Sequence, residues 1–274
     1  MKRTLHVGAA LIDSSGTPQE NLERIAQQAR IAEAIGVEVL LFAEVALHGY
    51  DYEVTSEQVA ALAETVEGES CQRLVAIAAV HNVTLMVGMF ERADGVFYNS
   101  HVVVGPQGIL GVQRKHCMAP VDEEAGIVRG PYERTVFTFK GVRTAILICA
   151  DTGIKDRYGL MARQGIDYTF IPTGGGGRVE DYICEADLAS DEGMARHVAN
   201  LPRVFLSKPF DEQSRKHRLG FTATNAMGRA GVNTCHQGHA TIVDNNGIIR
   251  AQAPGTIIRD HQHDTLIHAR LNFN

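Results

Sequence analysis

Three side chains of different chemistry occupy the same kind of position in the sequence. Glu44, Lys115 and Cys149 each follow a short, apolar stretch. A carboxylate can take the proton of a thiol and return it to a leaving amine. An ammonium can stabilise a developing oxyanion, and it also favours the thiolate form of a cysteine. Together, these three groups could form a hydrolytic site.

The stretches before these residues are predicted to be strands. Residues 144–148 carry no charge, and three of them are long and aliphatic, which is typical of a strand buried on both faces. Residues 37–43 and 109–113 are also predicted strands. Functional groups in open α/β proteins collect at the carboxyl ends of strands. We therefore expect the three side chains to meet at one edge of the sheet structure.

The N-terminal part predicts a β-α-β unit that delivers Glu44. Residues 5–12 form the first predicted strand, and Thr17-Pro-Gln-Glu20 has the pattern of a helix start with a capping box. Gly36 is the expected helix end, and residues 37–43 follow as the second strand. Such a unit implies a parallel pair of strands.

Taken one at a time, the three residues also have simpler interpretations. A single cysteine is most often a packed, structural thiol. Glu44 could be a solvated residue after a strand, and Lys115 is one of 26 basic residues. The case for a site therefore depends on finding all three in one recognisable context.

Three segments provide this context. They are residues 41–50 (Leu-Phe-Ala-Glu-Val-Ala-Leu-His-Gly-Tyr), 113–118 (Gln-Arg-Lys-His-Cys-Met) and 147–151 (Leu-Ile-Cys-Ala-Asp). They resemble the signature segments of the nitrilase, or carbon–nitrogen hydrolase, superfamily, in the family's order and with its approximate spacing. Flanking segments at 165–172 and 224–228 agree, so the resemblance covers nearly the whole chain.

The resemblance implies an α/β fold, a four-layer αββα sandwich, over residues 1–274 as a single domain. Within it we expect an irregular segment at about 173–220, with a short strand at 204–206, and a C-terminal tail at about 259–274 that contains a candidate strand at 266–271. It also implies a homodimer or a larger homo-oligomer. The implied mechanism requires no cofactor or metal.

The resemblance assigns a role to each residue of the triad. Cys149 would be the nucleophile, Glu44 the general base and acid, and Lys115 the stabiliser of the oxyanion. The backbone N–H of Ala150 would complete the oxyanion hole. The expected reaction passes through a thioester that water then hydrolyses.

A second glutamate is also expected from the resemblance. Glu123 lies seven residues before Gly130, at the family's spacing, and would help to position Lys115 and the substrate. Further residues expected to bind substrate are Tyr50, Pro172 and Thr173.

The substrate class is inferred from the same segments. Cys149-Ala-Asp151 is similar to amidase and N-carbamoyl hydrolase branches, whereas nitrilases more often have Trp-Glu there, and this chain has no tryptophan. We therefore favour a small linear amide or N-carbamoyl compound, with a nitrile as the alternative. An amidotransferase variant and a catalytically silent binding protein stay open. Residues 153–156 and the segment before Asn225, aligned at either 213–217 or 196–200, depart from the family pattern.

Composition limits the other classes. The formal net charge is −6, which argues against nucleic acid as the main partner. Five cysteines without a CxxC pair favour a reducing compartment. The chain has no apolar run long enough for a bilayer and no secretory signal pattern, so we expect a cytoplasmic protein away from membranes. His236-x-x-His239 lacks a supporting cysteine pair for a metal site. Residues 174–177 lack the Lys-Ser/Thr of a phosphate-binding loop.

Overall fold

The computed structural model describes residues 3–154, 156–199, 212, 215–253, 255 and 263–273. Its first sheet has the strand order β15-β1-β2-β3-β4-β5 and its second the order β14-β13-β10-β8-β7-β6. The first contains β1 (Arg3–Leu11), β2 (Val39–Leu41), β3 (Thr84–Ala93), β4 (Val96–Gly105), β5 (Gly108–Arg114) and β15 (Thr265–Phe273). The second contains β6 (Phe137–Phe139), β7 (Val142–Ile146), β8 (Tyr168–Thr173), β10 (Gly220–Asn225), β13 (Ala240–Val243) and β14 (Ile249–Ala253).

A small third sheet has the order β11-β12-β9. Its strands are β9 (Gly176–Arg178), β11 (Met227–Ala230) and β12 (Thr234–Gln237). The α-helices are α1 (Pro18–Ala34), α2 (Ser56–Leu62), α3 (Glu69–His81), α4 (Pro120–Glu124), α5 (Arg157–Arg163) and α6 (Asp191–Ala199). Short 3-10 turns are η1 (Cys149–Gly153), η2 (Val179–Asp181) and η3 (Glu185–Ala189).

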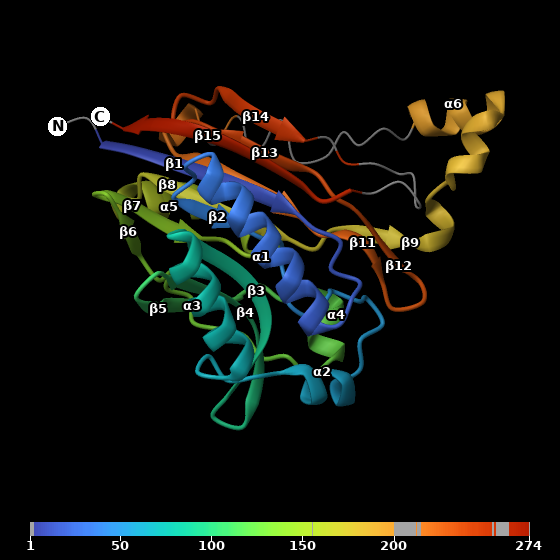
Figure 1. Cartoon of the computed structure of the whole chain (residues 1–274), viewed down its shortest axis with the longest axis horizontal. Coiled ribbons are helices and arrows are strands. Elements are labelled where there is room, and N and C mark those ends of the chain that lie inside the picture. The colour runs from blue at the N-terminus through green and yellow to red at the C-terminus, as the bar shows by residue number, and fades with distance from the viewer. Residues whose placement is uncertain are drawn as a thin grey trace.

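The two large sheets pack face to face, with helices outside them (Figure 1). Side chains from both sheets, including Val7, Met86 and Phe170, share one buried cluster between the layers. Helices α1 and α3 cover the outer face of the first sheet. On the second sheet, Met161 of α5 packs against Leu147. These layers form the predicted αββα sandwich, and apolar burial on both sides of each sheet stabilises it.

The predicted β-α-β unit is confirmed. The Thr17 side chain accepts from the N–H of Glu20, whose own side chain accepts from the N–H of Thr17, so the capping box is complete. Gly36, just after the helix, has the left-handed φ of +74° that favours glycine. Strands β1 and β2 are parallel, as expected for two strands of one sheet that are joined by a crossover through α1.

The C-terminal segment is not simply a tail. Within it, residues 265–273 form β15, which pairs antiparallel with β1 along its whole length. This pairing satisfies backbone groups of β1 that would otherwise be left at the edge of the sheet. The expected irregular segment also contains regular structure, namely β9, η2, η3 and α6. Figure 1 shows α6 beyond the third sheet, away from the two large sheets.

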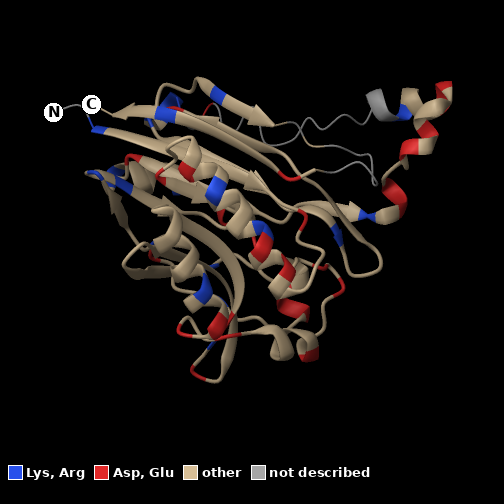
Figure 2. Cartoon of the chain, in the orientation of Figure 1, with Lys and Arg blue, Asp and Glu red and all other residues tan. Residues whose placement is uncertain are grey.

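Some predicted features lie outside the described residues. These are the strand at 204–206, the beginning of the tail at 259–262, and parts of both alternative alignments before Asn225. Among the described helices, none is long and apolar enough to cross a membrane. Figure 2 shows Lys and Arg interspersed with Asp and Glu along the chain, with acidic positions near α2 and α4.

Candidate active site

The ends of three strands bring the predicted triad together. Glu44 follows β2, Lys115 follows β5 directly, and Cys149 follows β7. The ammonium nitrogen of Lys115 lies 2.6 Å from Oε1 of Glu44, and both side chains are fully buried. A buried ion pair at this distance is a charge-assisted hydrogen bond with fixed geometry. The sequence therefore predicted correctly which strand ends meet.

A further carboxylate, which the sequence pattern did not indicate, completes this network. The Lys115 ammonium also donates to Oδ2 of Asp122 at 2.6 Å. Oδ1 of Asp122 accepts from the Tyr50 hydroxyl at 2.9 Å and from the Asn99 amide at 3.2 Å. Asn99 donates to Glu44 as well, at 2.8 Å. Lys115 is thus held between two carboxylates that share one amide donor.

Glu123 does not occupy the place expected for it. Its carboxylate is 57% exposed and pairs with Arg129 at 2.8 Å on the surface. Both acidic residues belong to α4, where adjacent side chains point about 100° apart. Asp122 therefore faces the buried side and reaches Lys115, while Glu123 faces solvent. The expectation that Glu123 positions Lys115 was wrong, and Asp122 makes that contact.

Cys149 lies at a sharp backbone turn. Its φ of +46° is in the left-handed region that non-glycine residues rarely adopt. Such strain persists only where the surrounding structure enforces it, and it is common at functional sites. The residue is partly exposed. Ala150, whose N–H was expected in the oxyanion hole, is the next residue and is also partly exposed.

Asp151 ties the cysteine turn to the lysine segment. Its Oδ1 accepts from the backbone N–H of His116 and of Cys117, at 3.1 and 2.8 Å. Its Oδ2 accepts from the N–H of Ile148 and from the Arg134 guanidinium. Because one buried carboxylate bonds to both segments, the positions of Lys115 and Cys149 are coupled.

Burial and the neighbouring charges set the protonation states. Burial raises the pKa of the Glu44 carboxyl, against the opposing effect of Lys115. Burial and the Glu44 charge raise the pKa of the Cys149 thiol to about 12. Burial alone would lower the pKa of Lys115, but its two carboxylate partners outweigh it and raise the pKa. The resting site therefore holds a neutral thiol beside a permanently charged ammonium.

Glu44 has a free oxygen for proton transfer. Oε1 is occupied by Lys115 and Asn99. Oε2 is buried and makes no hydrogen bond among the described residues. Hydrogen bonding between the Cys149 thiol and this carboxylate contributes to the raised pKa of the thiol. The arrangement suits a general base that accepts the thiol proton.

A cavity of about 390 Å³ opens at Cys149. Tyr50 lines it, as expected, but Pro172 and Thr173 do not. Both lie inside β8, and the Thr173 hydroxyl donates to Asn225 at 2.9 Å. The lining residues are Tyr50, Tyr52, Ala119, Pro120, Val121, Glu124, Cys149, Gly174 and Gly175.

One wall of this cavity is a glycine segment fixed by side chains. The Tyr52 hydroxyl donates to the carbonyl of Gly174 at 2.7 Å. The backbone of Gly174 partly offsets the rise in the Cys149 thiol pKa that burial causes. A Cβ added at Gly174 would lie 2.3 Å from the Tyr50 ring and 3.0 Å from Glu44. Only glycine leaves this space open.

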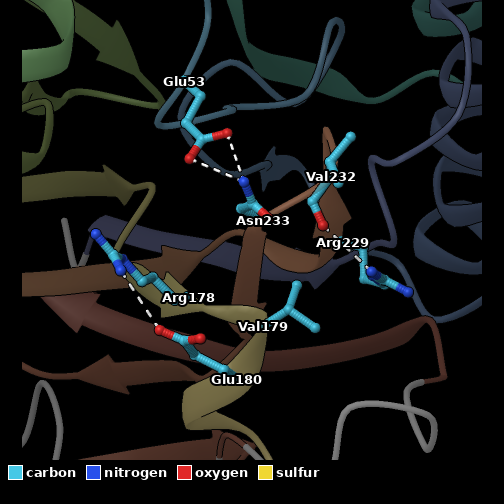
Figure 3. A pocket seen from close by; sticks show the side chains of 7 residues that line it. All are labelled: Glu53, Arg178, Val179, Glu180, Arg229, Val232 and Asn233. Carbon is cyan, nitrogen blue, oxygen red and sulfur yellow. Dashed lines mark hydrogen bonds and ion pairs between the residues drawn. The ribbon is translucent and has the colours of Figure 1, made fainter.

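A second cavity does not include Cys149 in its lining. It measures about 570 Å³ and lies on the third sheet, where Figure 3 shows Arg178 and Arg229 on opposite sides of Asn233. Asn233 donates to both oxygens of Glu53. Because Glu53 directly follows Tyr52, this contact helps to hold the segment that carries Tyr52.

His236, set aside as a metal ligand, lies between the carbonyls of Tyr50 and Gly175, at 2.7 and 3.3 Å.

Comparison with known proteins identifies the family of this chain. The sequence model described as carbon–nitrogen hydrolase matches residues 7–189, so the chain belongs to that family. An (R)-stereoselective amidase of Pseudomonas is 31% identical over 137 residues, which are 50% of this chain and 48% of the relative. A nitrilase of Pyrococcus abyssi is 28% identical over 156 residues, which are 57% of this chain and 59% of the relative. The chain thus matches roughly half the length of these relatives.

A solved structure has the same fold over nearly the whole chain. The amidase of Nesterenkonia AN1, from the nitrilase superfamily, superposes with a TM-score of 0.72 at 18% identity. The superposition covers 97% of this chain and 90% of that one. Another structure of that amidase, with the same score, coverage and identity, shows the acetamide moiety of fluoroacetamide on its active-site cysteine.

Proposed function

We propose that this protein hydrolyses a carbon–nitrogen bond in a small linear amide or N-carbamoyl compound through a thioester on Cys149. The observation that carries the proposal is the buried network in which Lys115 bridges Glu44 and Asp122 beside a partly exposed thiol. A structural ion pair gains little from burial, since desolvation offsets the attraction. A network of this kind at a cavity is better explained by chemistry.

The first half of the reaction forms the thioester. Glu44 takes the proton of the neutral Cys149 thiol while sulfur attacks the carbonyl carbon. The Lys115 ammonium and the N–H of Ala150 stabilise the oxyanion. When the carbon–nitrogen bond breaks, Glu44 returns the proton to the leaving nitrogen, which departs as ammonia or an amine.

The second half restores the enzyme. Water enters the cavity and loses a proton to Glu44 as its oxygen attacks the thioester carbon. The carbon–sulfur bond breaks, sulfur regains the proton, and the acid is released. Lys115 remains charged throughout, so its role is to stabilise the negative charge of the oxyanion. Glu44 carries out each proton transfer.

An amide is favoured over a nitrile for two reasons. The first is that Cys149-Ala-Asp151 resembles the amidase branches, and Asp151 here ties the cysteine turn to the lysine segment. The Pseudomonas relative and the Nesterenkonia structure are both amidases, although the Pyrococcus relative is a nitrilase.

The homo-oligomer implied by the resemblance stays a prediction, which light scattering would test.

Ammonia release tests this function. Short aliphatic amides, N-carbamoyl compounds and nitriles would be offered to the wild type and to Cys149→Ala. We expect release from amides or carbamoyl compounds, lost in the variant. Release from nitriles alone would overturn the choice of substrate class. Equal release by the variant would overturn the nucleophile.

A further inference from the structure

The described lining of the active-site cavity carries negative charge and no positive charge. Among its described lining residues, Glu124 is the only one with a formally charged side chain, and the others are apolar, aromatic, glycine or the nucleophile. No arginine, lysine or histidine belongs to that lining. A substrate that enters therefore meets a carboxylate and no exposed cation.

The buried charges beneath the cavity do not compensate for this carboxylate. Glu44 and Asp122 provide two carboxyl groups against the single ammonium of Lys115. If Glu44 is ionised, this group of three is net negative, and if Glu44 is protonated it is neutral. In either state, adding Glu124 gives these four residues together a net negative charge. Such a field repels an anionic substrate and attracts a cationic one.

Glu124 and the adjacent Glu123 differ in their ion pairs. Glu123 pairs with Arg129, on the outside of α4. Glu124 lines the cavity, and the ion pairs of the described residues do not include it. Its side chain is exposed, so its charge is available to a ligand. The two adjacent glutamates thus form a natural test and control pair.

We propose that Glu124 is a specificity-determining residue that selects amides or carbamoyl compounds whose far end carries an ammonium or a similar cation. The proposal rests on the hydrolase function above and narrows it. The carbonyl end of the substrate reacts at Cys149 while the cationic end pairs with Glu124 at the mouth. N-carbamoyl amino acids, which carry a free carboxylate, are disfavoured as substrates.

The first test compares substrates of equal length and different charge. Linear amides of four to six carbons would end in a methyl group, an ammonium or a carboxylate, and kcat/KM would be measured for each. We expect the wild type to prefer the ammonium series and to disfavour the carboxylate series. Glu124→Gln should reduce the ratio of cationic to neutral kcat/KM by about 3- to 10-fold, the range of a partly solvated ion pair.

Two further variants sharpen this comparison. Glu124→Lys should reverse the preference toward the carboxylate series. Glu123→Gln removes the same charge from the adjacent, outward-facing position and should leave the ratio within about twofold of the wild type. High salt should reduce the charge preference, because it screens partly exposed charges.

The second test does not require turnover. Methanethiosulfonate reagents with a cationic, neutral or anionic tail transfer the tail to a cysteine thiolate, forming a disulfide and releasing methanesulfinate. The rate at Cys149 would be followed by peptide mass spectrometry. The cationic reagent should react fastest with the wild type, and Glu124→Gln should reduce this advantage while Glu123→Gln should not.

The two tests separate the possible failures. If amides are not hydrolysed but the reagent ranking depends on Glu124, the hydrolase proposal fails while the cation-selective cavity stands. If amides are hydrolysed and neither ratio changes in Glu124→Gln, the role of Glu124 is overturned. An equal change of these ratios in Glu123→Gln would also overturn the role of Glu124. The effect would then depend on the net charge of α4 and not on a carboxylate that lines the cavity.

Discussion

The ammonium of Lys115 donates a hydrogen bond of 2.6 Å to the carboxylate of Asp122, seven residues further along the chain. The same ammonium bonds to Glu44 at the same distance. One carboxylate alone does not fix the direction of a flexible lysine side chain, but two acceptors together do. Lys115 is thereby held in the place from which it can stabilise an oxyanion.

Asp122→Asn should therefore reduce activity strongly. The substitution keeps the shape of the side chain but removes one of the two negative charges around Lys115. We expect kcat/KM to fall by about 10- to 100-fold, since loss of one partner from a buried charge pair costs roughly 2 kcal/mol or more. Glu123→Gln is the matched control and should have near wild-type activity. The reverse order of effects would restore Glu123 to the role that the sequence suggested.

The pH dependence of kcat/KM should report the raised pKa of Glu44. A general base acts in its ionised form, so activity falls as the pH drops through its pKa. Because burial raises that pKa above its usual 4.5, the acid limb should lie above pH 4.5. The Asn99 hydrogen bond opposes the shift, so Asn99→Ala should move the limb to still higher pH. Asn272→Ala, at an exposed position of β15, should leave it in place, and an unchanged limb in Asn99→Ala would contradict this explanation.

Removing the Tyr52 hydroxyl should affect Cys149 at a distance. Tyr52→Phe keeps the ring but releases the Gly174 carbonyl, so the Gly174 backbone, which lowers the thiol pKa, is held less well. Alkylation of Cys149 by iodoacetamide should then be slower at every pH below the thiol pKa, by about 3- to 10-fold. Tyr132→Phe makes the same chemical change at an exposed tyrosine and serves as the control. Equal rates in wild type and Tyr52→Phe would show that the hydroxyl is only structural.

How far the sequence could predict this site depends on the kind of contact. Strand ends are marked by local patterns, so the meeting of Glu44, Lys115 and Cys149 could be predicted. Helix α4 has only five residues, too few for a periodic pattern to show that Asp122 faces inward and Glu123 outward. The bond from Tyr52 to Gly174 joins positions 122 residues apart, and no local pattern encodes it.

The same distinction applies to the fold. The capping box at Thr17 depends on neighbouring residues and was predicted correctly. Strand β15 was only a candidate within an expected tail, because its alternation is weak and its stability comes from pairing with β1. Strand β8 continues through Pro172 to Thr173. Its pairing with β7 ends at Phe170, so Pro172 pairs with β10 alone, as in an edge strand, where a missing N–H is tolerated.

Asp151→Ala should destabilise the fold as well as the site. The Arg134 guanidinium is 3% exposed and would lose its carboxylate partner, together with three backbone N–H groups. We expect a loss of about 3 kcal/mol in the free energy of unfolding, measured by urea denaturation. Asp156→Ala breaks a solvent-exposed pair with Arg163 and should change stability little. Similar urea midpoints for the two variants would argue against the bridging role of Asp151.

The most direct test of the central claim is the intact mass of the protein shortly after it is mixed with a short amide. The account predicts a transient species heavier by the acyl group, located on Cys149 by peptide mapping and absent from Cys149→Ala. It should decay as the free acid appears. Ammonia release without any acyl adduct, persisting in Cys149→Ala, would contradict a thioester mechanism at this cysteine.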